Sequence, residues 1–223
     1  MVVSFDLSSS RNSKAREEYT AIVKTRIIEH LGTTDAITII PIDRASQTAS
    51  TTLFDLDCAL HRYGNELAGT DEERIIATAH QDSLKRAAER FDHTLTSAIT
   101  TRASYANGSD ILGSLAVAAK YKREGYTNIM IVLSDMLQCG GSLNFAVGLK
   151  TDTDVNAYLK QIPLLNLTGW QVIIITGGQA SISPDRFATV EHFWRQYFTA
   201  CHATVLEYSS GSTQYLQHFL STP

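Results

Sequence analysis

The sequence predicts an α/β protein with a doubly wound, mostly parallel sheet, helices on both faces and one antiparallel edge strand. Short apolar runs without alternation are typical of strands that are buried on both faces of a parallel sheet. Segments of helical length separate these runs, and an alternation of strand and helix predicts a doubly wound, Rossmann-like arrangement. The predicted strands are Val2–Phe5, Ala36–Ile42, Ile129–Leu133, Gln171–Thr176 and Ala203–Tyr208.

The helices are predicted from apolar residues at helical spacing and from signals at their ends. Residues 13–31 carry such an apolar stripe and are followed by Gly32, a common C-terminal stop. A long helical segment, about 71–102, opens with acidic residues that favour a helix start. Pro184 suits the first turn of the last helix. The other predicted helices are residues 110–123, 154–161 and 184–200.

Some segments do not fit the alternation of strand and helix. Residues 46–56 are rich in Thr and Ser, with a few apolar positions, and are interpreted as the antiparallel edge strand or ribbon. Residues 58–70 are predicted to be a loop. The loop 136–153 carries Leu143, Phe145, Val147 and Leu149, so it either presents an apolar partner surface or packs on the protein's own edge. Residues 1–223 are interpreted as a single domain, with segment 71–102 and loop 136–153 as embellishments.

Composition and charge exclude several classes of function. The net charge of −4 and the absence of a basic run argue against nucleic-acid binding through phosphate contacts. The longest strongly apolar run, residues 129–133, is too short to span a membrane, and no signal-peptide pattern opens the chain. The three cysteines show no C-x-x-C spacing, which disfavours disulfides and zinc. A reducing, cytoplasmic location without membrane association is therefore expected. The sequence leaves the oligomeric state open.

Side chains that carry oxygen occur at three boundaries between predicted elements. Asp6, Ser8 and Ser10 follow the first strand as D-x-S-x-S, Ser109 immediately precedes a helix, and Asp135 follows a buried strand. Ligands of open α/β sheets bind beyond the carboxyl ends of the strands. Carboxylate and hydroxyl oxygens suit a hard cation such as Mg²⁺. Each group alone fits a helix N-cap equally well, but the three together predict a cation site.

On these motifs and in its order of strands and helices, the chain resembles the von Willebrand factor A-type family, also called integrin I-like domains. That family has a metal-ion-dependent adhesion site written as D-x-S-x-S, then a Thr, then an Asp. Asp6, Ser8 and Ser10 match the first motif, Ser109 stands at the Thr position, and Asp135 matches the closing Asp. The family often has Gly after that Asp, whereas this chain has Met136, so the path of the following loop is open.

The resemblance implies a role for each of these residues. Ser8 and Ser10 would ligate Mg²⁺ or Mn²⁺ directly, Ser109 directly or through water, and Asp6 and Asp135 mainly through hydrogen bonds and bridging waters. Neutral hydroxyls leave most of the charge of the ion uncompensated, so a Glu or Asp from a protein partner can complete its coordination. The resemblance therefore implies a metal-dependent protein-interaction module, an intracellular scaffold subunit rather than an enzyme.

Two alternatives remain open. A phosphohydrolase of the haloacid dehalogenase type also has an Asp after its first strand, as Asp6 is here, and a Ser or Thr that ends a later strand, as Ser134 does. That chemistry needs a second Asp two residues after the nucleophile, where this chain has Ser8. The other alternative is a scaffold of the same fold whose metal site is not functional.

Overall fold

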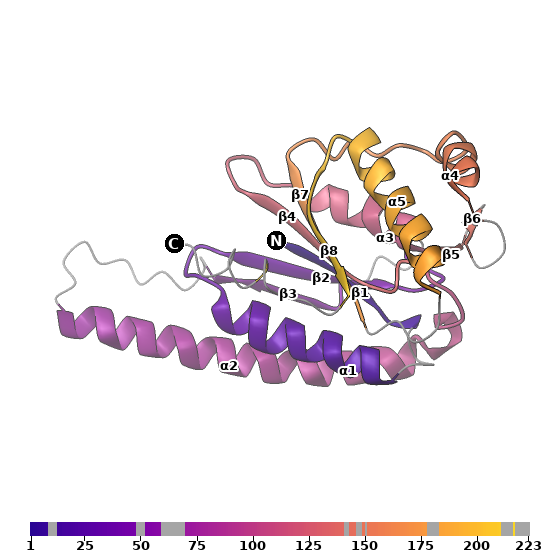
Figure 1. Ribbon diagram of the computed structural model, residues 1–223. Helices are drawn as coiled ribbons and strands as arrows, with labels where there is room; N and C mark the ends of the chain where they lie inside the picture. Colours follow the sequence, from indigo (N-terminus) through magenta and orange to yellow (C-terminus); the bar gives the residue numbers. More distant parts are fainter. Residues whose placement is uncertain are drawn as a thin grey trace.

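The fold is taken from a computed structural model of the whole chain. The structure describes residues 1–8, 13–47, 52–58, 70–140, 143–145, 149, 151–177, 183–210 and 216, without the side chains of 70–73 and 152–153. Within these residues, a six-stranded sheet has helices on both faces (Figure 1). Its strands are β1 (Val2–Asp6), β2 (Ala36–Ile42), β3 (Phe54–Asp57), β4 (Asn128–Leu133), β7 (Trp170–Thr176) and β8 (Thr204–Ser210).

The order of the strands confirms the predicted fold class. The sheet runs β3-β2-β1-β4-β7-β8, and every neighbouring pair is parallel except β2 and the edge strand β3. This order is that of a doubly wound, Rossmann-like sheet. The helices are α1 (Ser13–Ile22), α2 (Thr70–Thr101), α3 (Ile111–Ala118), α4 (Asp152–Leu159) and α5 (Pro184–Ala200).

Two cores form because successive side chains of a strand point to opposite faces of the sheet. On one face, Phe5 of β1 and Ile131 of β4 pack with α1 and α2. On the other face, Met130 and Val132 of β4 pack with α3 and α5. Figure 1 shows α1 and α2 on one side of the sheet, and α3 and α5 on the other. Strands covered on both faces explain why the apolar runs in the sequence do not alternate.

The first predicted helix, residues 13–31, is helical as far as His30 but not uniformly α-helical, and Leu31 is already extended. After α1 the chain continues as a π-helix, η2 (Val23–Ile27), and then as a short 3₁₀-helix, η3 (Ile28–His30). The apolar stripe gives the extent of the helix correctly, since Val23, Ile27 and Ile28 are buried. The change of helix type follows from the hydrogen-bond pattern, which side-chain periodicity does not encode.

The predicted edge strand is shorter than residues 46–56. Residues 44–47 form turns, and only β3 (Phe54–Asp57) pairs with β2, in antiparallel register. Residues 48–51 lie outside the described part of the chain, as does most of the predicted loop 58–70.

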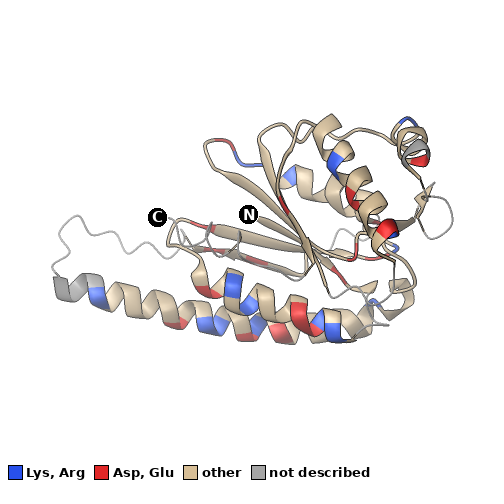
Figure 2. Cartoon of the chain, viewed as in Figure 1, with Lys and Arg blue, Asp and Glu red and all other residues tan. Residues whose placement is uncertain are grey.

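The long predicted helix is confirmed as α2, along which positive and negative side chains are interspersed (Figure 2). Mixed charges of this kind are typical of a solvated helix face.

The loop 136–153 contains a short hairpin that the sequence does not predict. Its strands are β5 (Cys139–Gly140) and β6 (Leu143–Asn144). Leu143, Phe145 and Leu149 are buried in the core under α5, so for these residues the packing alternative is correct and a partner surface is not. Val147 lies outside the described residues.

None of the helices in the described part of the chain combines the length and hydropathy that a membrane span requires.

Candidate metal site

Three parallel strands bring the first and third motifs to one edge of the sheet. Asp6 is the last residue of β1 and pairs in register with Ile42 at the end of β2. On its other side, Phe5 of β1 pairs with Leu133 at the end of β4. The residue after Leu133 is Ser134, which therefore lies beside Asp6. This edge holds the carboxyl ends of the strands, as the ligand-binding rule for such sheets predicts.

The carboxylate of Asp6 lies at the centre of a cluster of hydroxyl groups. It is 1% exposed. Its Oδ1 accepts hydrogen bonds from the amide of Ser8 at 2.8 Å and from Ser8 Oγ at 2.5 Å. Its Oδ2 accepts a hydrogen bond from Ser134 Oγ at 2.6 Å. Ser109 Oγ lies 3.4 Å from Oδ2 and also contacts the hydroxyl of Ser8. The structure therefore brings Asp6, Ser8 and Ser109 together, although Ser8 and Ser109 are 101 residues apart in the sequence.

Ser109 is positioned by the start of α3. The next residue, Asp110, is the N-cap of this helix and accepts a 3.1 Å hydrogen bond from the amide of Gly113. A Cβ on Gly113 would lie 2.1 Å from Asp110 Oδ2, so a larger residue here would displace the capping carboxylate. The amide of Cys139 donates to the carbonyl of Ser109 at 2.9 Å, which attaches the hairpin β5–β6 to the same loop.

Gln138 connects the loop after β4 with the start of α3. Its side chain is 1% exposed. Oε1 accepts a hydrogen bond from the amide of Leu112 at 3.1 Å, and Nε2 donates to Asp110 Oδ1 at 3.2 Å and to the carbonyl of Gly140 at 3.0 Å. Because Gln138 follows Asp135 by three residues, it links the segments that carry Ser109 and Asp135.

Asp135 contributes a second carboxylate that is largely buried. Its Oδ1 accepts a 2.9 Å hydrogen bond from the amide of Leu137. Burial, together with the nearby charge of Asp6, raises the pKa of Asp135 to about 7. Burial also raises the pKa of Asp6, against the opposing effect of its hydrogen bonds from Ser134, Ser8 and Ser109. Two carboxyls with raised pKa values at one strand edge favour a bound proton or cation that removes their repulsion.

Met136 adopts the backbone conformation that usually belongs to glycine. Its φ is +62°, in the left-handed region, and its side chain is fully buried. Its amide donates to Ser134 Oγ at 3.1 Å, and its carbonyl accepts a 2.9 Å hydrogen bond from Trp194 Nε1 of α5. The loop after Asp135 therefore turns at a left-handed residue although no glycine is present. Burial of the side chain and these two bonds offset the conformational cost.

Four of the five predicted site residues lie in the described part of the chain, and Ser10 lies outside it. The sequence analysis names Ser134 only in the phosphohydrolase alternative and not as a residue of the metal site, and it misses Asp43 and Gln138 altogether. Asp43 had a usable signal, because it directly follows a predicted strand, as Asp6 does. Gln138 had none, since a single Gln in a loop is compatible with many environments.

The donor set fits a hard cation. The side chains that meet around Asp6 carry only oxygen: its own carboxylate and the hydroxyls of Ser8, Ser109 and Ser134, with the charge of Asp135 nearby. Such oxygens suit Mg²⁺ or Mn²⁺ rather than softer metals. Within the described residues, no group of three or more His, Cys, Asp or Glu side chains is arranged to hold a metal. A cation at this edge would therefore depend on the serine hydroxyls.

Comparisons with known proteins give little further information. No family model matches the chain, and no curated protein matches it. Among solved structures, the chain is similar to "von Willebrand factor type A from Catenulispora acidiphila", with 14% identity and a TM-score of 0.46. The match covers 98% of this chain and 40% of that one, so this chain spans less than half of that length. At such values the likeness says nothing about function, and the fold assignment rests on the sheet itself.

Proposed function

We propose that this protein is a von Willebrand factor A-type interaction module that binds one Mg²⁺ or Mn²⁺ through Asp6, Ser8, Ser10, Ser109 and Asp135. A cation held by these residues would supply the position at which a Glu or Asp carboxylate of a protein partner is bound. The observation that carries this proposal is the contact of the Ser8 and Ser109 hydroxyls beside the buried Asp6 carboxylate. Segments distant in sequence converge there with the residue types that the resemblance requires.

The chemistry of these residues supports binding of an anionic group. The hydroxyls of Ser8 and Ser109 are neutral, so direct ligation by them leaves the cation strongly positive. Asp6 and Asp135 balance part of the charge and orient the hydroxyls and waters around the ion, a role that outer carboxylates commonly have. When bound, the cation supplies a Lewis-acidic position that attracts a carboxylate oxygen from outside the chain.

We propose a binding role rather than catalysis, because the described residues around Asp6 do not include the acid that a phosphohydrolase places two residues after its nucleophile. Ser8 occupies the position where that chemistry requires a second acid. Ser134 donates its hydrogen bond to Asp6 and accepts one from the amide of Met136, so its hydroxyl is committed to the fold.

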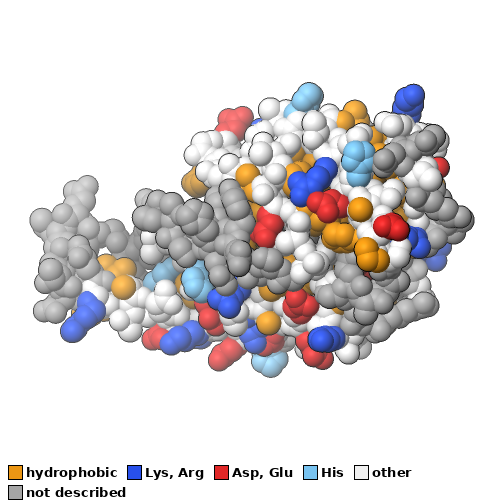
Figure 3. Space-filling view, viewed as in Figure 1, with side chains coloured by type: hydrophobic (Ala, Val, Ile, Leu, Met, Phe, Trp, Pro, Cys, Tyr) orange, Lys and Arg blue, Asp and Glu red, His pale blue; other side chains and the backbone are white. Residues whose placement is uncertain are grey.

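Recognition in this proposal depends on the cation rather than on a large apolar patch. Among the described residues, the large hydrophobic side chains that are exposed come from separate elements: Ile75, Tyr105, Tyr121, Tyr126 and Leu164. On the face shown in Figure 3, hydrophobic groups are small and separated by polar and charged side chains. The three cysteines are free thiols, which fits the proposed intracellular scaffold.

A titration with Mn²⁺, followed by the relaxation of water protons, tests this proposal. Bound Mn²⁺ that keeps open coordination positions enhances relaxation, and a carboxylate that takes such a position lowers the enhancement. We expect enhancement with the wild type, competition by Mg²⁺, and a decrease when acetate or a Glu-containing peptide is added. The same peptide with Gln in place of Glu should have no effect.

Ser109→Ala and Ser114→Ala form a matched pair for this titration. Ser114 is equally buried, but its hydroxyl donates to Ser4 at 3.1 Å rather than contacting Asp6. We expect Ser109→Ala to lose the enhancement and Ser114→Ala to retain it. Equal enhancement in both variants would contradict the assigned site. Mg²⁺-dependent hydrolysis of p-nitrophenyl phosphate that Asp6→Asn abolishes would instead favour the phosphohydrolase.

A further inference from the structure

A buried ion pair lies behind the segment that carries Ser109. Arg102 directly follows α2 and is 8% exposed, and its Nε donates a 2.6 Å hydrogen bond to Oδ2 of Asp43. Asp43 is fully buried and directly follows β2, whose last residue, Ile42, pairs with Asp6. The ion pair therefore joins the end of α2 to the strand beside the candidate metal site.

The segment from Arg102 to Asp110 is attached to the end of β2 at three points. The first is the ion pair itself. In the middle, the carbonyl of Tyr105 accepts a hydrogen bond from the amide of Arg44 at 3.1 Å. At the end, the amide of Asp110 donates to the carbonyl of Asp43 at 3.0 Å. Asp43 thus holds the beginning of the segment through its carboxylate and the end through its backbone.

Asp43 is itself fixed in place. Its amide donates to Ser46 Oγ at 2.9 Å, and its Oδ1 accepts from the amide of Ala45 at 2.8 Å. The amide of Leu7 donates to the carbonyl of Ile42 at 3.0 Å, so the same strand end also supports the loop after Asp6. The end of β2 is therefore a common support for both segments whose hydroxyls meet at the site.

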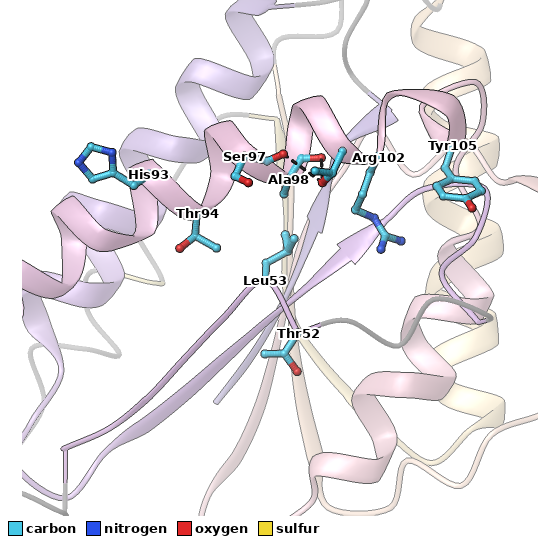
Figure 4. Close-up of a pocket in the computed structure, with 9 residues that line it drawn as sticks. Thr52, Leu53, His93, Thr94, Ser97, Ala98, Arg102 and Tyr105 are labelled. Atoms are coloured by element: carbon cyan, nitrogen blue, oxygen red, sulfur yellow. Dashed lines mark hydrogen bonds between the residues drawn. The ribbon is translucent and has the colours of Figure 1, made fainter.

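Arg102 also contacts the segment that it anchors. Its guanidinium lies 5.8 Å from the centroid of the Tyr105 ring, a cation–π geometry. These two side chains form one end of a groove of about 610 Å³ that runs along α2 towards His93 (Figure 4). The planar guanidinium can bond to Asp43 and face an aromatic ring at once, which the ammonium of a lysine does less well.

Stability alone does not explain this arrangement, because a buried ion pair is often no more stabilising than apolar residues of similar volume. The pair does hold segment 102–110, which contains Ser109, against the end of β2. Mg²⁺ needs near-ideal octahedral geometry at short distances, whereas Ca²⁺ accepts longer and more variable ones. A displaced hydroxyl therefore weakens Mg²⁺ binding more than Ca²⁺ binding.

We propose that Arg102, through Asp43, is a positioning residue for the metal site and determines its preference for Mg²⁺ over Ca²⁺. This inference rests on the proposed function. It concerns a residue that contacts neither the cation nor a partner and acts through the placement of segment 102–110.

Calorimetric titrations with Mg²⁺ and with Ca²⁺ test the inference on the full chain. The main variant combines Arg102→Met with Asp43→Asn, so that no uncompensated charge stays buried. The control is Arg123→Met, which breaks the solvent-exposed ion pair with Asp57. We expect the double variant to bind Mg²⁺ about tenfold more weakly, in line with supporting residues of other metal sites. We expect its Ca²⁺ affinity to change by less than about threefold, and the control to behave as the wild type.

Unchanged Mg²⁺ affinity in the folded double variant would overturn the inference, as would an equal loss for both cations. If the double variant does not fold, as judged by circular dichroism and thermal melting, Arg102→Lys takes its place. Lysine keeps the positive charge of Arg102 without the guanidinium geometry. We therefore expect Arg102→Lys to fold and to bind Mg²⁺ more weakly than the wild type. Unchanged Mg²⁺ binding in this variant would overturn the inference. If the wild type binds neither cation, the proposed function is contradicted. If the wild type and the variants bind Mg²⁺ equally well, only this inference is contradicted.

Discussion

The indole nitrogen of Trp194 donates a 2.9 Å hydrogen bond to the carbonyl oxygen of Met136, the residue after Asp135. Both side chains are fully buried. The bond fixes the left-handed turn at Met136 from the side of α5. It therefore connects the packing of the last helix to the loop that carries one of the two carboxylates of the candidate site.

Trp194→Phe should destabilise the protein more than Trp170→Phe. Both tryptophans are fully buried, but Trp170 Nε1 has no hydrogen-bond partner among the described residues, so its removal leaves no acceptor unsatisfied there. Removing the Trp194 donor leaves the Met136 carbonyl without this bond, which costs about 1–3 kcal/mol. Urea unfolding of both variants measures the difference. Equal losses in the two variants would show that the bond does not contribute.

Gln138→Met should cost about 1–3 kcal/mol of unfolding free energy, because the amide of Leu112 loses its buried acceptor and Asp110 loses a donor. Mg²⁺ affinity should fall as well, since Gln138 links the segments of Ser109 and Asp135. Gln196→Met is the control: its contact with His192 is exposed on α5, and changes at such sites stay within about 0.5 kcal/mol. Chemical denaturation and calorimetry together separate the two effects. Gln138→Met with wild-type stability would argue against this link.

Gly113→Ala should disrupt the N-cap of α3. The new Cβ would lie 2.1 Å from Asp110 Oδ2 and 2.6 Å from Gln47 Cγ, so the capping carboxylate must move. Loss of such a cap costs about 1 kcal/mol, and crowding adds to that cost. Gly125→Ala provides the comparison, because it meets no atom within 4 Å and is strained only through its φ of +78°. Thermal melting of both variants, with Mg²⁺ titration, should show that only Gly113→Ala also weakens metal binding.

The stability of the metal-free protein should fall as the pH rises from about 4 towards 7. The folded state raises the pKa of Asp135 to about 7, whereas an unfolded Asp titrates near 4. Between these values the folded state binds more protons, so deprotonation at higher pH costs stability. Asp135→Asn keeps an acceptor for the Leu137 amide but cannot ionise, and it should flatten this dependence. Denaturant unfolding in chelator at several pH values is the measurement, and parallel curves for both proteins would contradict the assignment.

The sequence is sufficient to predict the parallel sheet and the meeting of Asp6 with Ser109, because strand ends and helix starts occupy known places in a doubly wound fold. The sequence does not predict the left-handed backbone of Met136, which Met rarely adopts. Burial of its side chain and the hydrogen bond from the indole of Trp194 stabilise this conformation, and neither can be inferred from the sequence. It also does not reveal Asp43, Arg102 and Gln138 as supports. The contacts that make them supports join Arg102 to Asp43 over 59 residues and Gln138 to Leu112 over 26, and polar pairing at that range leaves no periodic pattern.

Calorimetric titration of Mg²⁺ into the wild type and Asp6→Ala measures whether the serine cluster around Asp6 binds a cation. Asp55→Ala is the control, because Asp55 lies on the edge strand and accepts a hydrogen bond from Thr38 rather than from the serine cluster. We expect one saturable Mg²⁺ site in the wild type and in Asp55→Ala, and none in a folded Asp6→Ala. Saturable binding that survives in Asp6→Ala, or no saturable binding in the wild type, would rule out a metal site at Asp6.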